Sequence, residues 1–401
     1  MRLNALISLI HSKKAAIGVI GLGYVGLPLA TLIARKGFRV TGFVRDPSKI
    51  NQKKIRVAHI DSDELNEQDI YIICVPTPVF ENKKPDLGAI RSVAQRLSLV
   101  LLDGKLIINE STVAPGTTRE EFGSLGGKYF LACSPERVDP GNKDKTVRTI
   151  SKVVGGVNPE SLALAKVLYE KVLDAPVVSV SSLEAAEMVK MLENTYRAVN
   201  IALVNEFARL SEKTGLDVVE IIEAAKTKWS YHAHYPSVGV GGHCIPVDPW
   251  YLVDFSKKKN VNLTLIEQSL KENDAMAQVV ADKVISQYKK GATVLLYGLT
   301  YKKDVKDIRE SPVIRLARIL QKNNIRFVAY DPLLNEQEIK AFGFTPGKLK
   351  TSDIFIVGTD HKQLSGDFKR CVDNNTIIID GRNFFRIKVG KSVLGVGRSL
   401  V

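Results

Sequence analysis

A glycine-rich turn follows an apolar run near the start of the chain and limits the folds that the chain can adopt. Residues 15–20 are apolar and lead directly into Gly21, Gly23 and Gly26. Apolar residues then recur at helical spacing, and residues 38–44 have the composition of a second strand. In this β-α-β setting the GxGxxG pattern predicts dinucleotide binding, because the glycines permit a tight turn and let a pyrophosphate approach the helix N-terminus.

The end of the second expected strand leaves the type of dinucleotide open. A carboxylate that binds the ribose of NAD is expected about 20 residues after the glycines, where this chain has Val44, Arg45 and Asp46. Arg45 suits the 2′-phosphate of NADP, whereas Asp46 reaches a ribose if the strand end shifts. The candidate cofactor-binding residues in these two stretches are Gly21, Gly23, Tyr24, Val25, Gly26, Arg45 and Asp46.

Further apolar runs predict that the parallel sheet continues through the first half of the chain. They lie at residues 69–75, within 99–109, at 129–133 and at 176–179. Turn-forming and polar residues follow these runs, and open parallel sheets bind ligands at the carboxyl ends of their strands. The candidate ligand-binding residues at these ends are Pro76, Thr77, Thr112, Glu136, Arg137 and Val138.

Residues 183–214 contain neither glycine nor proline and keep apolar residues at helical spacing. A single helix of this length would measure roughly 45–50 Å, which suits a spine between two lobes or a dimer seam. Asn194 and Asn205 interrupt the apolar stripes and are candidates for a polar site. The alternative for Lys190 and both asparagines is a solvated helix face.

A second α/β region follows. We expect its strands at residues 294–299, 326–330, 354–358 and 376–380, alternating with helical segments, and we treat 256–291 as a connector. The predicted fold class is α/β, with two Rossmann-like doubly wound parallel-sheet domains joined by a central helical domain that contains a long helix. The predicted domains are residues 1–180, 181–290 and 291–401.

A loop in the central region presents one cysteine among glycines. Gly239, Gly241 and Gly242 precede Cys244, and Asp248 follows between two prolines. Glycines let the backbone come close to a ligand, and a thiolate is a strong nucleophile. The competing interpretation is a buried structural cysteine beside a Gly-Pro turn.

Composition narrows the classes of partner. Lys and Arg number 57 against 43 Asp and Glu, so the net charge of +14 favours anionic ligands. The basic residues are dispersed without interleaved aromatic residues, so we expect no nucleic-acid partner.

The four cysteines are widely spaced and predict neither a disulfide framework nor a metal site. No run reaches transmembrane length, and residues 3–10 suit a short docked amphipathic helix, so we expect a cytoplasmic protein without a membrane partner.

An ordered set of motifs resembles the UDP-glucose/GDP-mannose dehydrogenase family, and within it the UDP-N-acetylhexosamine 6-dehydrogenases. The resemblance implies an NAD-binding domain, a central helical domain that forms a homodimer, and a C-terminal domain that binds the UDP group of a UDP-sugar. The matching stretches are GVIGLGYVGLPLA from Gly18, CVPTP from Cys74, ESTVAPGTT from Glu110, SPERVDPGN from Ser134, EAAEMVKMLENTYRAVNIALVNE from Glu184, VGGHCIPVDPW from Val240 and GLTYKKDVKDIRESP from Gly298.

The resemblance implies a four-electron oxidation, in which two NAD molecules convert a sugar C6 alcohol into a carboxylate. Cys244 matches the family nucleophile, which forms a thiohemiacetal and then a thioester. Lys190 and Asn194 match the pair that polarises the C6 oxygen, and Glu136 matches the acid that activates water. The remaining matched residues place water or substrate, and they are Thr112, Asp248, Arg137, Val138, Gly239, Gly241, Gly242, Lys303 and Arg309.

The loop around Cys244 resembles the N-acetylhexosamine branch, because Val247 stands where the glucose branch usually carries a lysine. SPERVDPGN favours UDP-N-acetylglucosamine over UDP-N-acetylmannosamine as the substrate, and the product would enter polysaccharide synthesis. Three alternatives remain: a UDP-glucose 6-dehydrogenase, a two-electron hydroxyacid dehydrogenase, and a nucleotide-binding sensor without turnover. The first measurement that separates them is the number of nicotinamides reduced per sugar.

Overall fold

The chain forms two compact units in a computed structural model that describes residues 2–138, 144, 146–385 and 393–398. One unit comprises Met1–Glu193 and Trp250–Asn262, and the other comprises Asn194–Pro249 and Leu263–Val401. Two of the three boundaries fall within helices α6 (Leu183–Thr214) and α8 (Asp248–Lys258), and the third lies between α8 and α9 (Thr264–Gln287). None of the helices among the described residues is long and apolar enough to cross a membrane.

The first unit is built on an eight-stranded sheet in the order β3-β2-β1-β4-β5-β6-β7-β8. All neighbouring strands are parallel except β6 and β7, which pair antiparallel. The order reverses direction between β1 and β4, which creates the crevice where such sheets bind ligands. The strands are β1 (Ala16–Ile20), β2 (Arg39–Val44), β3 (Arg56–His59), β4 (Ile70–Ile73), β5 (Leu106–Asn109), β6 (Phe130–Cys133), β7 (Lys152–Gly156) and β8 (Val177–Ser179).

Helices cover both faces of this sheet, which is why its central strands are continuous apolar runs. One core cluster joins one face to α1, α2 and α5, and another joins the opposite face to α3, α4 and the start of α6. Leu6 and Ile10 of α1 are buried in the first cluster, so the expected docking of the N-terminal helix is confirmed. The helices are α1 (Arg2–His11), α2 (Gly26–Arg35), α3 (Gly88–Leu97), α4 (Thr117–Phe122) and α5 (Pro159–Val172), with short 3₁₀ helices η1 (Pro47–Lys49) and η2 (Asp63–Glu67).

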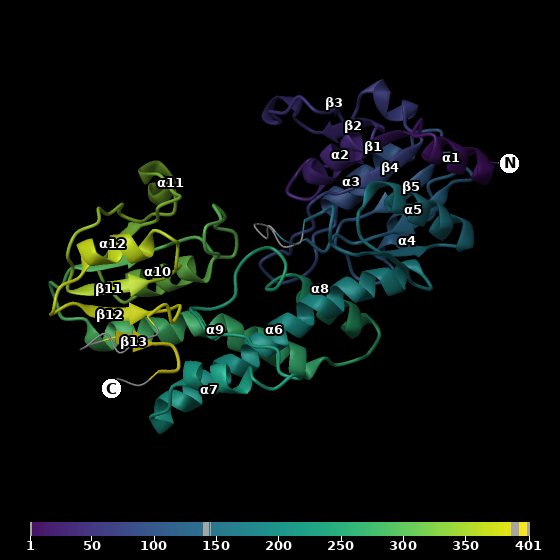
Figure 1. Cartoon of the computed structure of the whole chain (residues 1–401). Coiled ribbons are helices and arrows are strands. Elements are labelled where there is room, and N and C mark those ends of the chain that lie inside the picture. The colour runs from purple at the N-terminus through teal and green to yellow at the C-terminus, as the bar shows by residue number, and fades with distance from the viewer. Residues whose placement is uncertain (1, 139–143, 145, 386–392, 399–401) are drawn as a thin grey trace. The chain divides into compact units, whose positions relative to one another are not determined.

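The second unit contains a five-stranded parallel sheet in the order β10-β9-β11-β12-β13. Its strands β11, β12 and β13 lie side by side in Figure 1. Helices α9 and α10 pack on one face, and α12 packs on the other. Ser311 caps α10 by accepting a hydrogen bond from Val313 N, and Pro312 occupies the first helical turn, as predicted. The elements are α7 (Val218–Ala225), α9 (Thr264–Gln287), β9 (Val294–Tyr297), α10 (Pro312–Lys322), β10 (Val328–Tyr330), α11 (Glu336–Ala341), β11 (Ile354–Val357), α12 (Leu364–Cys371), β12 (Ile377–Asp380) and β13 (Val393–Gly395).

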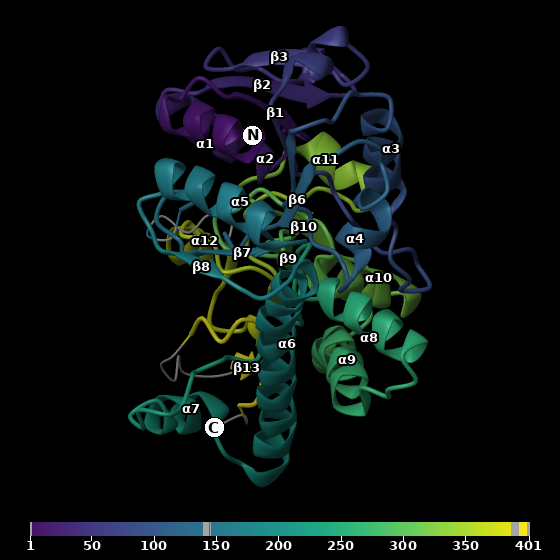
Figure 2. The ribbon, with the colours of Figure 1, turned by 90° about the vertical axis from the view of Figure 1, so that its right-hand side faces the viewer.

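Helix α6 is a continuous helix of 32 residues (Figure 2), which confirms the element predicted for residues 183–214. The predicted fold class is also confirmed, with parallel sheets in two α/β domains and a helical region between them in the sequence. Two expectations were incomplete or wrong. Strands β3, β7 and β13 were not foreseen, and residues 256–291, expected to be a connector, contain the 24-residue helix α9.

Candidate active site

The glycine-rich turn connects β1 to α2 and has space for a ligand on one side only. Gly21 has φ +93°, and a Cβ there would lie 2.6 Å from the Cys74 carbonyl oxygen. A Cβ at Gly26 would lie 1.9 Å from the Gly21 carbonyl oxygen, whereas one at Gly23 would have nothing within 4 Å. Val25 at the helix N-cap makes no side-chain capping bond, so the first helical N–H groups suit a pyrophosphate.

Asp46, which follows β2, makes side-chain contacts with residues close to it in the sequence. Asp46 accepts hydrogen bonds from Ser48 N at 3.2 Å and Ser48 Oγ at 2.5 Å, and it pairs with Lys49 Nζ at 3.2 Å. These contacts hold the pKa of Asp46 below its usual value. Arg45 is exposed beside it. This strand end therefore presents both the carboxylate considered for ribose binding and the guanidinium considered for 2′-phosphate binding.

Residues that follow β4 and β5 meet at the carboxyl edge of the first sheet. Thr77 Oγ1 donates to the Thr112 carbonyl oxygen at 2.7 Å. Tyr251, from α8, donates through its hydroxyl to the carbonyl oxygens of Thr77 at 2.8 Å and Pro78 at 3.0 Å. The structure therefore brings predicted Thr77 and Thr112 together and adds Tyr251, which the sequence interpretation missed.

Glu136 lies in a buried charged cluster behind this edge. Its Oε1 accepts from Arg137 N at 2.6 Å and Val138 N at 2.9 Å, and its Oε2 lies 3.0 Å from Lys152 Nζ. Lys152 also binds Glu110 Oε2 at 2.6 Å. Burial alone would raise the pKa of Glu136, but the ammonium and the two backbone donors outweigh burial and leave that pKa lowered.

The side chain of Arg137 points to a second carboxylate. Its Nε lies 3.2 Å from Glu193 Oε2 and its Nη2 lies 2.5 Å from Glu193 Oε1, while Nη1 donates to the Ser151 carbonyl oxygen at 2.8 Å. Arg137 is therefore held by a bidentate ion pair to the end of the first-unit part of α6. The last four residues of the SPERVDPGN stretch, 139–142, lie outside the described residues.

The cysteine loop packs against the segment that precedes α10. A Cβ at Gly241 would lie 2.6 Å from Tyr301 Cβ and 2.7 Å from Pro312 Cδ. Gly242 has φ +90°, faces the Tyr301 ring, and donates its N–H to the Arg309 carbonyl oxygen at 3.1 Å. These close approaches explain why the loop is glycine-rich, because side chains there would separate it from the segment that contains Arg309.

Cys244 lies one turn before Asp248, the first residue of α8. The Cys244 carbonyl oxygen accepts from Val247 N at 3.1 Å and Asp248 N at 2.8 Å, and the cysteine is half-buried. Asp248 is buried, and its Oδ2 accepts from Asn194 Nδ2 at 2.5 Å. Three predicted site residues of the second unit are thus connected by hydrogen bonds.

Arg309 is oriented by a neighbour that the sequence interpretation did not single out. Its guanidinium contacts both carboxylate oxygens of Asp307, with Nη2 2.6 Å from Oδ2. Burial raises the pKa of Asp307, but Arg309 outweighs it, so this pKa is lowered. Burial and the nearby Arg309 lower the pKa of His243, which therefore resists protonation.

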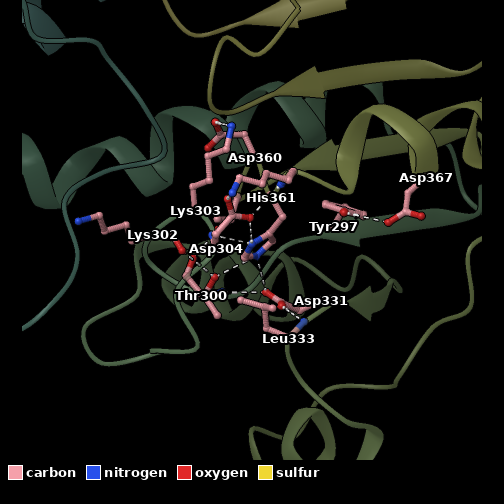
Figure 3. Close-up of polar contacts among 12 residues, drawn as sticks. Tyr297, Thr300, Lys302, Lys303, Asp304, Asp331, Leu333, Asp360, His361 and Asp367 are labelled. Atoms are coloured by element: carbon pink, nitrogen blue, oxygen red, sulfur yellow. Dashed lines mark hydrogen bonds and ion pairs between the residues drawn. The ribbon is translucent and has the colours of Figure 1, made fainter. Parts of the chain in front are cut away.

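Loops at the carboxyl edge of the second sheet form a polar network around His361 (Figure 3). His361 is fully buried, and its Nδ1 accepts from Asp304 N at 3.0 Å. That contact leaves the proton on Nε2, which lies 3.2 Å from Asp331 Oδ2. The loop of residues 302–304 is thereby anchored to the ends of β10 and β11. Lys303 lies on this loop, 3.7 Å from Asp360.

The two helix positions expected to form a pair are one turn apart on α6. Lys190 is buried and Asn194 is half-buried, so neither is a simple solvated position. Asn205 has a different role, since its Nδ2 donates to Asn273 Oδ1 at 2.9 Å and joins α6 to α9. The polar interruption at Asn205 thus contributes a side-chain hydrogen bond between two helices.

The sequence interpretation missed Lys152, Glu110 and Tyr169, which complete the cluster around Glu136. The available signal was a lysine at the start of an apolar run, because a lysine within a buried strand requires charged partners. Among the described residues, no group of three or more His, Cys, Asp or Glu side chains is placed to hold a metal ion.

Three models of one protein family match the chain in order. The NAD binding domain of the UDP-glucose/GDP-mannose dehydrogenase family matches residues 15–68 and 52–173. The central domain of that family matches residues 184–275, and its UDP binding domain matches residues 295–387. The chain therefore contains the family's NAD-binding and UDP-binding domains.

Individual relatives are similar over nearly their whole length. The UDP-N-acetyl-D-mannosamine dehydrogenase of Methanococcus maripaludis is 34% identical, across 93% of this chain and 94% of the relative. The UDP-N-acetyl-D-glucosamine 6-dehydrogenase of Pseudomonas aeruginosa is 35% identical, across 83% and 87%. The solved structure of a UDP-D-ManNAc dehydrogenase from Pyrococcus horikoshii is 30% identical, with a TM-score of 0.83 across 96% of this chain and 99% of the other. With all three domains matched in order and these relatives covered nearly end to end, the chain belongs to the UDP-glucose/GDP-mannose dehydrogenase family.

Proposed function

We propose that this chain is an NAD-dependent UDP-N-acetylhexosamine 6-dehydrogenase. It would oxidise the C6 alcohol of UDP-N-acetylglucosamine or UDP-N-acetylmannosamine to the carboxylate, through a thiohemiacetal and a thioester on Cys244. Family membership supports an oxidoreductase with NAD- and UDP-binding domains. The names of the relatives and the residue Val247 support an N-acetylhexosamine rather than glucose.

The observation that carries this proposal is the hydrogen-bonded series from Cys244 to Asp248 to Asn194. A nucleophilic cysteine needs fixed backbone and polar neighbours that hold the reacting carbonyl group. The hydrogen bonds that the Cys244 carbonyl accepts from the following helical turn fix the backbone of the cysteine. The 2.5 Å hydrogen bond from Asn194 to Asp248 fixes its polar neighbours. A structural cysteine beside a Gly-Pro turn would not require this buried carboxylate–amide pair.

The reaction divides into residue-based steps. When bound, NAD would supply the hydride-accepting chemistry of both oxidations, and the residues of this chain hold and activate the reacting groups. Cys244 attacks the aldehyde carbon because loss of hydride at that oxidation level needs a tetrahedral adduct. Lys190 and Asn194 stabilise the oxyanion that forms on the former C6 oxygen. Glu136 takes a proton from the water that cleaves the thioester, while Thr112 and Asp248 help to orient water and sugar.

The second unit would hold the UDP group at the carboxyl edge of its sheet. The strand order reverses direction between β9 and β11, and ligands bind open α/β sheets at such points. Lys303 and Arg309 lie on the segment that leaves β9 and supply positive charge for a pyrophosphate. The other proposed substrate-binding residues are Glu136, Arg137, Val138, Lys190, Asn194, Gly239, Gly241 and Gly242.

The first unit would hold the cofactor on the uncapped N-terminus of α2, beside the open space at Gly23. Asp46 would bind the ribose after releasing one of its local partners, with NADP as the alternative through Arg45. The other proposed cofactor contacts are Gly21, Tyr24, Val25, Gly26, Pro76, Thr77 and Thr112.

The enzyme would act as a cytoplasmic homodimer, with domains at residues 1–180, 181–290 and 291–401, and its product would serve polysaccharide synthesis. An exposed apolar stripe on α6 supports the dimer. Its members lie within about one quarter to one third of the helix circumference. They are Met188, Leu192, Tyr196, Leu203, Phe207 and Leu210.

The test measures how many nicotinamides are reduced for each UDP-sugar consumed, with NAD and NADP in parallel. We expect two NADH per UDP-N-acetylhexosamine, abolished in Cys244→Ala, and faster reaction with NAD. The two epimers and UDP-glucose are compared as substrates. A ratio of one that survives Cys244→Ala would identify a two-electron alcohol dehydrogenase, and cofactor binding without turnover of any sugar would identify a sensor.

A further inference from the structure

A lysine on the strand next to one edge of the first sheet is almost completely buried, so water does not solvate its charge. Lys152 begins β7 and is 1% exposed, and Val153 and Val154 follow it on the same strand. Taking an ammonium ion out of water costs several kcal/mol unless charged partners compensate. The identity of those partners indicates what this lysine does.

Two buried carboxylates share this ammonium group. Lys152 Nζ lies 2.6 Å from Glu110 Oε2 and 3.0 Å from Glu136 Oε2, and both carboxylates are at least 95% buried by exposed area. Tyr169, from α5, donates its hydroxyl to Glu110 Oε1. Residues from β5, β6, β7 and α5 thus converge on one ion, with a formal net charge of −1 when both carboxylates are ionised.

Stability alone does not account for such a cluster. Well-packed apolar residues commonly replace a buried ion pair with no loss of stability, and an unequal set of charges is harder still to bury. Buried charges that perturb one another are enriched at functional sites. Glu136 is the member of this cluster that the proposed function uses.

The contacts distinguish the two carboxylates. An ionised carboxylate can accept about four hydrogen bonds, and Glu136 receives two backbone N–H bonds on Oε1 and the ammonium on Oε2. The remaining acceptor position is on Oε2, beside the lysine. Glu110 receives no backbone donor in the described contacts, and only Tyr169 and Lys152 reach its oxygens.

The protonation preferences agree with this asymmetry. Burial raises the pKa of Glu110 more than Lys152 lowers it, whereas the pKa of Glu136 is lowered despite burial. A proton in the cluster therefore resides on Glu110 and leaves Glu136 ionised. The charged or titratable groups that face Glu136 are Lys152 from β7, Glu110 after β5 and, more remotely, Tyr169 from α5 and Cys74 after β4.

We propose that Lys152 is a positioning residue that holds Glu136 in its ionised form and directs Oε2 toward the water that cleaves the thioester. This assignment rests on the proposed function. In that step the water oxygen bonds to the thioester carbon, one water proton goes to Glu136, and the C–S bond breaks. Cys244 leaves as a thiolate, and the carboxylic acid releases the second proton to solvent.

The experiment compares Lys152→Met with Glu110→Gln in the full-length enzyme. The substrate is the UDP-N-acetylhexosamine that the wild-type enzyme oxidises, with NAD. Single-turnover NADH formation reports the two hydride transfers, and mass spectrometry of quenched enzyme reports the sugar adduct on Cys244. The pH dependence of steady-state turnover reports the ionisation of Glu136.

Loss of Lys152 should slow hydrolysis and leave hydride transfer nearly unchanged. We expect Lys152→Met to lower steady-state turnover at least tenfold, to accumulate the Cys244 adduct, and to move the acid limb of the pH profile to higher pH. Because Glu110 takes up a proton before Glu136 does, Glu110→Gln changes no charge where Glu136 titrates and should leave that limb in its wild-type position. A purely structural role of Lys152 would reduce hydride transfer and turnover together and would not move the limb.

If Lys152→Met does not fold, the double variant Glu110→Gln/Lys152→Met replaces it in these measurements. This variant keeps the formal net charge of −1 that the cluster has when both carboxylates are ionised. Lys166→Met, which removes a surface lysine that pairs with Glu170 at 3.7 Å, should behave as wild type. Equal losses of burst and turnover in Lys152→Met, with no adduct and an unmoved acid limb, would overturn the assignment. A wild type that oxidises no UDP-sugar would instead overturn the proposed function, together with this assignment.

Discussion

At the scale of single residues, two glycines of the same turn face different surroundings. Gly21 has a left-handed conformation, and a side chain there would strike the backbone of Cys74. Gly23 does not have a positive φ, and a Cβ there would meet no protein atom within 4 Å. The first glycine is therefore required by the fold, and the second is required only by what binds beside the turn.

This difference predicts separate effects of two alanine substitutions. Gly21→Ala should lower the free energy of unfolding by about 1–3 kcal/mol because of the strained φ and the backbone clash. Gly23→Ala should leave stability within about 0.5 kcal/mol and weaken NAD binding at least tenfold. Urea unfolding and NAD titration of each variant measure the two effects. Equal NAD affinity of Gly23→Ala and wild type would contradict the proposed path of the pyrophosphate.

Residues that chemistry singles out were easier to predict than residues that support them. Cys244 and Asp248 stand out among glycines and prolines, and the structure connects them to Asn194. Lys152 does not stand out, because its partners are 42 and 16 positions away in the sequence. A pairing over such distances depends on strand order, which no local pattern reveals.

At the scale of elements, α6 contributes a carboxylate to the start of another helix. Glu187 is 1% exposed and accepts from Gly116 N at 2.6 Å and Thr118 N at 2.8 Å, at the N-terminus of α4. A carboxylate suits exposed N–H groups at a helix start. Burial nevertheless outweighs these hydrogen bonds and raises the pKa of Glu187 to about 7.

The raised pKa predicts a pH-dependent loss of stability. The folded state holds the Glu187 proton more tightly than the unfolded state, so the free energy of unfolding falls as pH rises from about 4.5 through 7. The fall is at most about 3 kcal/mol. In urea unfolding at pH 5 to 8, the stability of wild type relative to Glu187→Gln should decline as pH rises.

Glu184→Gln provides the matched control on the same helix. Arg119 holds the pKa of Glu184 down, at about 2, so its stabilising charge is lost only under strong acid. The difference between wild type and Glu184→Gln should stay constant between pH 5 and 8. If the Glu187→Gln difference is also constant over this range, Glu187 titrates outside it and the expected shift is wrong.

Whole elements were predicted where their periodicity is long or their turns are distinctive. Helix α6 follows from 32 residues without a breaker, and α10 follows from the Ser311–Pro312 start. Strand β7 escaped prediction because it begins with a lysine and ends in two glycines. Its burial pattern depends on β6 and β8 at its sides, which a local pattern cannot supply.

At the scale of the whole molecule, the apolar stripe on α6 predicts an oligomer. Leu203, Phe207 and Leu210 are each at least half exposed and lie on one helix face. Exposed apolar side chains along a helix are costly in a monomer and typical of helix–helix interfaces. A homodimer along α6 would remove them from water.

Charge on this stripe should separate the subunits. We expect Leu203→Glu/Phe207→Glu to convert a dimer into a monomer in sedimentation at micromolar concentration. Leu99→Glu, at a more exposed apolar position outside α6, should leave the dimer intact. A monomeric wild type, or a double variant that still dimerises, would contradict the proposed interface.

The sequence by itself determined the order of the structural parts and which residues are candidates for the chemistry. Residues adjacent in the sequence determine three features: the GxGxxG turn, the unbroken helix and the cysteine loop. Each follows from backbone conformation or local periodicity. These patterns identified the family and the dinucleotide-binding turn, and they indicated a candidate nucleophile, before any contact was known.

Only the tertiary structure decided how the supporting residues are paired. Tertiary geometry pairs Lys152 with Glu136, which is 16 positions away, and Asn205 with Asn273, which is 68 positions away. The physical reason is burial: once water is excluded, every charge and amide needs a partner, and packing determines which partner is within reach. The protonation of Glu136 is set in the same way, by the strand that brings a lysine to it.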